Sequence, residues 1–124
     1  MLNIALPKGR LGDKVYSLFS SIGYSCTEMM HDSRKLVFES EESDVRYLLV
    51  KPSDVAIYVE RGAADIGVVG KDVLLETKAS VYELLDLGFG RCNLAVAAPE
   101  NYVDDTALPL RVATKYKNVA SEYY

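Results

Sequence analysis

The chain has 124 residues, of which 49% are hydrophobic and 26% are charged, and its formal net charge is −4 at pH 7. These values are typical of a globular protein with one domain, or with one domain and a piece of a second. Nucleic acids and anionic membrane surfaces attract basic proteins, so an acidic chain is poorly suited to either partner. We therefore expect a globular protein that binds neither nucleic acid nor membrane.

The chain contains two cysteines, Cys26 and Cys92, and one histidine, His31. No C-x-x-C pair and no Cys/His spacing of a zinc site occurs, which predicts two free thiols in a reducing compartment and no metal held by the protein. The amino-terminal residues lack the apolar region of a signal peptide, and no apolar run approaches the roughly 18 residues that span a membrane. These features predict a cytoplasmic protein.

The first predicted elements are a strand and a helix. Residues 2–6 form an apolar run before Pro7, which is typical of a buried strand. Apolar side chains from Leu11 to Ile22 then recur on one helical face, and Gly23 suits the position just after a helix.

Two further strands and a second helix are predicted next. Residues 35–39 and 45–50 have strand character on either side of an acidic turn. Pro52 and Ser53 suit the first turn and the cap of a helix that ends at Gly62. This helix is expected to bury Val55 and Val59, with Tyr58 as a further candidate for the buried face.

The rest of the chain is expected to continue with extended segments at 64–70, 82–90, 91–99 and 110–116, and with helices at 71–77 and 118–124. Apolar strands that lack strict alternation favour a parallel sheet covered on both faces. The predicted fold class is therefore α/β, with a mostly parallel or mixed sheet flanked by helices. Because the chain stops inside an expected helix, we expect it to be truncated.

The first candidate site lies at Lys8, Gly9 and Arg10, between the first strand and the first helix. The first amides of a helix lack intrahelical partners and lie at the positive end of its dipole, so such a junction binds phosphate readily. Lys8 can supply a point charge and Arg10 a bidentate fork, while Gly9 permits a close approach. The alternative is two exposed cations at a turn, because the segment matches neither the Walker nor the dinucleotide glycine pattern.

A second group of candidates precedes the strand at 35–39. Arg34 and Lys35 lie at the mouth of this strand, and one of them is expected to join an anion site. His31 is expected to be solvated or hydrogen-bonded rather than catalytic, because no nucleophile signature accompanies it. Asp104 and Asp105 are assigned to a solvated loop, since no apolar strand precedes them.

The remaining candidates lie at predicted strand ends. Gly67 and Gly70 end an apolar strand, where ligands often cross the top of a sheet. Asp65 is expected either to join this site or to accept a structural hydrogen bond. One short segment, at the end of the strand expected at 110–116, carries three groups that suit a phosphorylated ring compound. They are the hydroxyl of Thr114, the ammonium of Lys115 and the aromatic ring of Tyr116.

Taken together, these stretches resemble the ATP phosphoribosyltransferase family, which catalyses the first step of histidine biosynthesis. The matching pieces, in family order, are ALPKGRL, SRKLVF, SDVAIYVERGAADIGVVGKDVLLE, VYELLDLGFGRCNLAVA and RVATKYKNVASEYY. The resemblance implies an enzyme that joins N1 of the adenine of ATP to C1 of 5-phosphoribosyl 1-diphosphate and releases diphosphate, which Mg²⁺ neutralises. It also implies a lobe like the type II periplasmic binding proteins at residues 1–92, with the crossover and the start of a second lobe at 93–124.

The resemblance further implies roles for single residues. Arg10 and Arg34 would be catalytic and face the departing diphosphate, where preplaced cations speed the step. Substrate binding would fall to Lys8, Gly9, Asp65, Gly67, Gly70, Thr114, Lys115 and Tyr116. The family's loop for the 5-phosphate, of the type Asp/Glu-x-Gly-x-Thr-Leu, does not occur in these 124 residues, so we predict negligible turnover for the chain alone.

The resemblance also implies partners, and the residues leave two other classes of function open. We expect a homo-oligomer, and the short form of the family pairs with a regulatory subunit resembling histidyl-tRNA synthetase. One alternative is a noncatalytic nucleotide- or anion-binding module with a periplasmic-binding-protein-like fold. Another is an interaction protein whose incomplete sheet edge pairs with a second copy.

Overall fold

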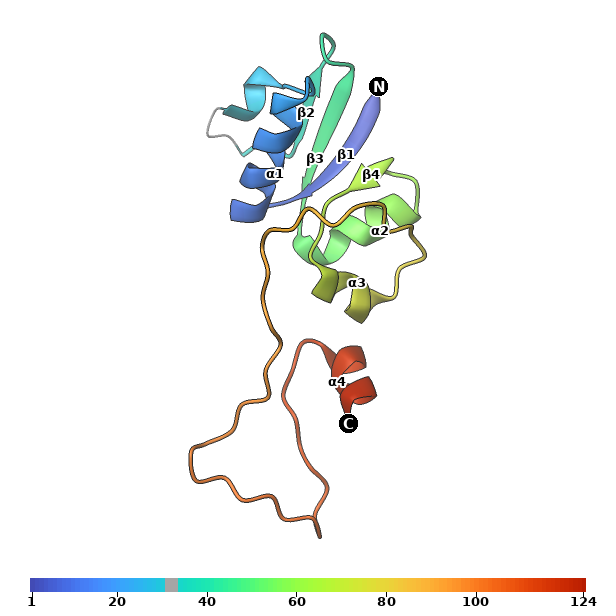
Figure 1. Cartoon of the computed structure of the whole chain (residues 1–124). Helices are drawn as coiled ribbons and strands as arrows, with labels where there is room; N and C mark the ends of the chain where they lie inside the picture. The colour runs from blue at the N-terminus through green and yellow to red at the C-terminus, as the bar shows by residue number, and fades with distance from the viewer. Residues whose placement is uncertain (31–33) are drawn as a thin grey trace.

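A four-stranded sheet forms the centre of the computed structural model, which describes residues 1–30 and 34–124 (Figure 1). The expectation for His31 lies outside the described residues. The strands are β1 (Leu2–Pro7), β2 (Val37–Ser40), β3 (Val45–Val50) and β4 (Ile66–Gly67), in the spatial order β2-β3-β1-β4. β1 pairs in parallel with both β3 and β4, whereas β2 pairs antiparallel to β3. The prediction of a mostly parallel or mixed sheet is confirmed.

Helices follow the strands in the expected order. They are α1 (Arg10–Ser21), the 3₁₀ turns η1 (Thr27–Met30) and η2 (Pro52–Asp54), α2 (Val55–Glu60), α3 (Lys71–Thr77) and α4 (Lys117–Tyr123). None of the described helices has the length and apolar character needed to cross a membrane.

The core lies on both faces of β1. Ile4 and Leu6 are fully buried in a cluster with Val15 of α1, and Ala5 is fully buried in a second cluster with Val55 of α2. The alternation of a strand sends neighbouring side chains to opposite faces, so α1 covers one face of the sheet and α2 the other. This arrangement explains why β1 is apolar at every central position.

Tyr47 of β3 anchors the α1 side of the core. Its ring makes edge-to-face contacts with Tyr16 and Phe19 at centroid distances of 5.4 and 6.4 Å. Its hydroxyl donates a hydrogen bond of 2.5 Å to the carbonyl of Tyr24, and burial raises the pKa of Tyr47 above its ordinary value. An aromatic cluster thus fixes α1 and the segment after it to the sheet.

Several expectations for the second half were wrong. The strand expected at 64–70 is reduced to Ile66–Gly67, and the segment at 110–116, expected to run as a strand into a turn, contains no strand. The segments at 82–90 and 91–99, expected only to be extended, contain neither helix nor strand. After α3 the chain passes back along the sheet, where Leu87 and Phe89 pack against the core cluster of Ile4 and Leu6. It then extends away as a long segment and returns at α4, beside α3 (Figure 1). A segment with strand propensity forms a strand only where a neighbouring backbone pairs with it.

The exposure of α2 also differs from the prediction. Val55 is buried and Val59 is half-buried, as expected, but Tyr58 is 37% exposed and points outward. The helix has only six residues, and only one side of it contacts the sheet. Tyr58 lies outside that side. The division of the chain at residue 92 into two lobes stays a prediction.

Candidate functional site

One edge of the sheet collects most of the predicted site residues. The carboxyl ends of β1, β3 and β4 meet there, since Pro7 pairs with Val50 and Ala5 pairs with Gly67 in parallel register. β2 is antiparallel, so its beginning lies at this edge rather than its end, as the hydrogen bond from Leu49 N to Leu36 O shows. We call this the carboxyl edge, and it carries residues 8–10, 34–36, 51–53 and 68–71. Ligands of α/β proteins bind characteristically at such an edge.

The junction between β1 and α1 is shaped by backbone contacts. Gly9 is the N-cap of α1 and has φ 103°, a conformation that favours glycine over other residues. Lys8 N donates to Val50 O at 2.9 Å, and Asp13 N donates to Gly9 O at 3.1 Å. Among the described residues no side chain caps this helix start, so its first amides remain available to an anion.

Sequence reasoning missed Gly12, which allows α1 to begin close to β1. A Cβ at this position would lie 2.0 Å from the carbonyl oxygen of Pro7, inside any permitted contact. The helix can therefore start against the strand end only with glycine here. A glycine in the first turn of an amphipathic helix was the signal that could have revealed this contact.

Four cations at the carboxyl edge are exposed, and within residues 1–30 and 34–124 no side chain pairs with them: Lys8, Arg10, Arg34 and Lys51, the last of which sequence reasoning did not identify. Lys35, in contrast, forms an ion pair with Glu28 and lies over the Phe38 ring, and the hydrogen bond that Lys35 donates to Glu28 raises the pKa of Lys35. Of the two cations before β2, Arg34 is therefore the one available to a ligand.

Arg10 follows β1 and Arg34 precedes β2, so both lie at the carboxyl edge, but β1 and β2 are not neighbours in the sheet. β3 lies between β1 and β2, and strands are spaced about 4.8 Å apart, so the two backbones are separated by roughly 10 Å. Arginine side chains that extend from both sides can reach an anion placed between them. That their guanidinium groups converge in one pocket stays a prediction.

Asp65 lies at the opposite edge of the sheet. Its carboxylate accepts hydrogen bonds from the backbone N and the side-chain Nδ2 of Asn3, at 2.8 and 3.0 Å. These two bonds, the backbone one first, lower the pKa of Asp65 below its ordinary value. The position does not fit the expected substrate-binding role and fits the structural alternative, in which Asp65 joins β4 to the start of β1.

The two glycines after Asp65 differ in their surroundings. A Cβ at Gly67 would lie 2.8 Å from Cγ1 of Val55 and 3.0 Å from Cγ2 of Val59, so this glycine lets α2 pack closely on β4. Gly70 is the N-cap of α3 and lies at the carboxyl edge. Close packing against α2 thus explains why position 67 is a glycine. Gly70 lies where a ligand could contact it.

The segment of Thr114 to Tyr116 reaches the site from far along the chain. The hydroxyl of Tyr116 donates to Oδ2 of Asp72 in α3 at 2.5 Å, which raises the pKa of the Tyr116 phenol. Thr114 Oγ1 accepts from the backbone N of Tyr116 at 3.0 Å, and Lys115 Nζ lies 5.0 Å from the Tyr116 ring centroid. Tyr116 is therefore held at the first turn of α3, next to the carboxyl edge. Sequence reasoning did not identify Asp72.

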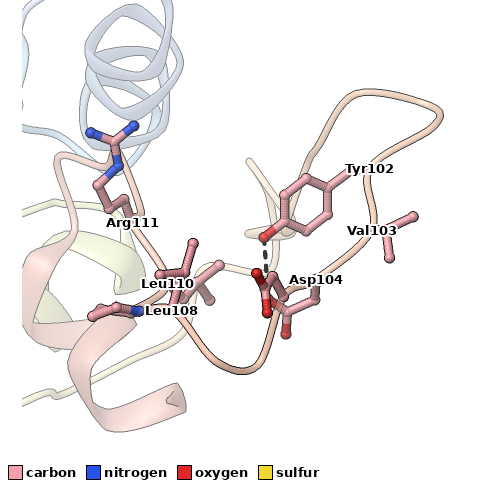
Figure 2. Close-up of a pocket in the computed structure, with 8 residues that line it drawn as sticks. Tyr102, Val103, Asp104, Leu108, Leu110 and Arg111 are labelled. Atoms are coloured by element: carbon pink, nitrogen blue, oxygen red, sulfur yellow. Dashed lines mark hydrogen bonds between the residues drawn. The ribbon is translucent and has the colours of Figure 1, made fainter.

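A hollow in the loop at residues 102–111 contains none of the predicted site residues (Figure 2). The chain folds back on itself there, and a hydrogen bond of 3.3 Å joins the Tyr102 hydroxyl to Asp104. Residues 102–111 are exposed, as expected for the solvated loop of Asp104 and Asp105. The candidate site is therefore the carboxyl edge.

Comparisons with known proteins point to one family. The family model of ATP phosphoribosyltransferase matches residues 51–124. Curated ATP phosphoribosyltransferases of Brachyspira hyodysenteriae and of a Bacillus cereus strain are 60% and 50% identical over 100% and 99% of the chain. The chain spans only 60% and 58% of the length of these two relatives.

A solved structure shows the same fold. The chain matches the "ATP phosphoribosyl transferase (HisG:HisZ) complex from Thermotoga maritima" with a TM-score of 0.58 and 35% identity, over 68% of this chain and 39% of that one. This likeness confirms the expected fold class, an α/β lobe of the type II periplasmic-binding-protein kind. From the family model and these relatives, the chain belongs to the ATP phosphoribosyltransferase family.

Proposed function

We propose that the chain forms part of an enzyme of histidine biosynthesis that transfers the phosphoribosyl group of 5-phosphoribosyl 1-diphosphate to N1 of ATP. The bond between C1 and the diphosphate oxygen breaks, a bond between C1 and N1 forms, and diphosphate leaves. The observation that carries the proposal is a set of exposed cations at the carboxyl edge of an acidic chain, without side-chain partners in the described residues: Lys8, Arg10, Arg34 and Lys51. The identity of 60% with a curated ATP phosphoribosyltransferase supports it.

The proposed role of Arg10 and Arg34 follows from where charge develops. As the bond to C1 breaks, negative charge grows on the diphosphate oxygens. Cations fixed before the reaction stabilise this charge more than they stabilise the ground state, so they lower the barrier. A guanidinium group offers two parallel donors to a phosphate, and Lys8 adds a point charge beside the free amides of α1.

In this proposal Mg²⁺ arrives with the substrate diphosphate rather than in a site built by the protein. The described part of the chain contains no group of three or more His, Cys, Asp or Glu side chains that could hold a metal ion. Mg²⁺ commonly binds through substrate phosphates with few protein ligands.

The nucleotide would bind beside the start of α3. Tyr116 presents an aromatic ring there. Gly70 is the N-cap of the same helix, and a Cβ at this position would lie 2.2 Å from Oδ1 of Asp72, so the Asp72 carboxylate lies close to both residues. Flat rings stack well on aromatic side chains, so Tyr116 suits adenine. Thr114 and Lys115 are exposed beside it and would contact the polar parts of the nucleotide.

The proposal extends to assembly and compartment. A similar solved protein is described as a complex of two different subunits, which supports a partner of the regulatory kind in addition to self-association. Cys26 and Cys92 are both free thiols, as expected in the reducing cytoplasm.

Binding to the carboxyl edge tests the anion site. We would titrate the chain with magnesium diphosphate by calorimetry and compare Arg10→Ala and Arg34→Ala with Arg61→Ala. Arg61 follows α2 and is exposed but lies away from the carboxyl edge, so it serves as the matched control. Losses of roughly tenfold or more in affinity at positions 10 and 34, with none at 61, would support the site. Equal behaviour of all three variants would contradict it.

Turnover separates the enzyme from a noncatalytic binding module. Because the chain spans 60% of the Brachyspira relative, we would place it in that relative in exchange for the matched segment. Diphosphate release by this chimera in the presence of ATP and 5-phosphoribosyl 1-diphosphate would support the enzyme. Binding of ATP without diphosphate release would favour the noncatalytic module.

A further inference from the structure

A set of polar contacts joins α3 to α4 across more than 40 residues of chain. The two helices lie side by side (Figure 1). Asp72 accepts from the Tyr116 hydroxyl, Glu76 accepts from backbone amides at the start of α4, and Lys78 pairs with Glu122 at 2.5 Å. We call the four residues Asp72, Glu76, Tyr116 and Asn118 the α3–α4 clasp.

Glu76 caps α4 from outside that helix. Its carboxylate accepts from the backbone N of Asn118 at 3.0 and 3.1 Å and from the backbone N of Val119 at 3.0 Å. In return, Asn118 Nδ2 donates to the carbonyl oxygen of Glu76 at 2.8 Å. α4 has no cap from its own preceding side chain, so Glu76 satisfies amides that would otherwise be without an acceptor.

The charge on Glu76 strengthens this cap. Desolvation favours the neutral form of the carboxyl group, but the hydrogen bonds from Val119 and Asn118 outweigh it, and the pKa of Glu76 lies below its ordinary value. A carboxylate at the start of a helix is also attracted by the helix dipole. The amide donors therefore keep the Glu76 carboxyl group in its charged form, which is the better acceptor.

The clasp fixes Tyr116 because α4 begins directly after it. Tyr116 is the N-cap residue of α4, two positions before the amide of Asn118 that Glu76 binds. The residues before Tyr116 are exposed and belong to a long segment without strand or helix. Glu76 and Asp72 are thus the contacts that place the ring at the first turn of α3.

We propose that Glu76 is a positioning residue for the nucleotide site: by capping α4 it holds the Tyr116 ring beside the carboxyl edge. The inference rests on the proposed function for the identity of the ligand. Glu76 itself does not touch the reacting atoms. Glu122 pairs with Lys78, but both side chains are exposed and an exposed ion pair contributes little, so Glu122, which caps no helix start, serves as a matched control for the loss of a carboxylate on α4.

The first arm of the test needs no ligand. In the 124-residue chain, Glu76→Ala should raise the rate of amide hydrogen exchange at Asn118 and Val119 by roughly tenfold, which is the effect expected from the loss of one helix cap. It should also weaken the contact between Tyr116 and Asp72, and so lower the pKa of Tyr116 toward its ordinary value. This pKa would be measured by NMR titration of the Tyr116 ring signal, which is assigned because Tyr116→Phe removes it. Glu76→Gln keeps one acceptor and should restore part of both effects, while Glu122→Ala should change neither. Unchanged exchange, or an unchanged Tyr116 titration, in Glu76→Ala would overturn the proposal.

The second arm uses ATP with Mg²⁺ as the probe, measured by calorimetry. Glu76→Ala should weaken ATP binding about tenfold, and Glu122→Ala should leave it unchanged. Equal affinity in wild type and Glu76→Ala would overturn the role of Glu76 at the nucleotide site. Absence of ATP binding in wild type would instead overturn the proposed function, and the first arm would still decide whether Glu76 positions Tyr116.

Discussion

Gly12 in the first turn of α1 lies against the carbonyl group of Pro7 at the end of β1, so closely that a Cβ at position 12 would stand 2.0 Å from that oxygen. The contact brings the start of the helix to the end of the central strand. Lys8, Gly9 and Arg10 fill the short connection between them, and their conformation depends on this closeness.

Gly12→Ala should therefore destabilise the protein. An alanine in a helix interior usually stabilises by about 1 kcal/mol relative to glycine, but the clash with Pro7 must displace α1 and costs roughly 1–3 kcal/mol of overpacking. Urea unfolding should show a lower free energy of unfolding for Gly12→Ala, and no such loss for Ser17→Ala on the exposed face of the same helix. A rise in stability would contradict the close contact.

Gly67→Ala should destabilise through contact with α2. The new methyl group would meet Cγ1 of Val55 at 2.8 Å, so we expect a loss of about 1–3 kcal/mol in the free energy of unfolding. Val55→Ala also destabilises, because that side chain is fully buried. The double variant should lose less than the sum of the two single losses, since the smaller residue at 55 makes room. Additive losses would show that the two positions do not meet.

The stability of the protein should depend on pH through Asp65. Hydrogen bonds from Asn3 lower the pKa of the folded carboxyl group, so its contribution is fully present above the ordinary pKa of about 4 and is lost as pH falls through the lower folded value. The free energy of unfolding should therefore fall less steeply in acid for Asp65→Asn than for wild type. Glu41→Gln, in the exposed turn after β2, is the control and should keep the wild-type slope. Identical acid slopes for wild type and Asp65→Asn would argue against the bonds to Asn3.

Arg10→Ala in the Brachyspira chimera should affect the chemical step more than nucleotide binding. Removal of one donor to developing negative charge typically lowers kcat by about 10²–10³-fold. Initial rates and ATP titrations would separate the two effects, with Arg61→Ala as the control. Equal losses in kcat and in ATP affinity would point to simple substrate binding by Arg10 instead.

Local patterns in the sequence determined most of the regular elements near the site. The apolar run of β1, the one-sided helix of α1 and the helix at Lys71–Thr77 all appear where expected. Helical periodicity, a glycine at a helix end and a proline in a first turn act over a few residues, so a sequence displays them directly. The cations at positions 8, 10 and 34 could be found for the same reason.

The tertiary structure alone decided which of these residues meet. Asp65 and Gly67 follow one another closely in the chain, yet one binds Asn3 at the far edge of the sheet and the other packs under α2. Tyr116 reaches Asp72 across 44 residues, and the apolar segments between α3 and α4 have no strand partner. Strand pairing, helix packing and capping between distant helices depend on the arrangement of the whole chain in space, which no local pattern encodes.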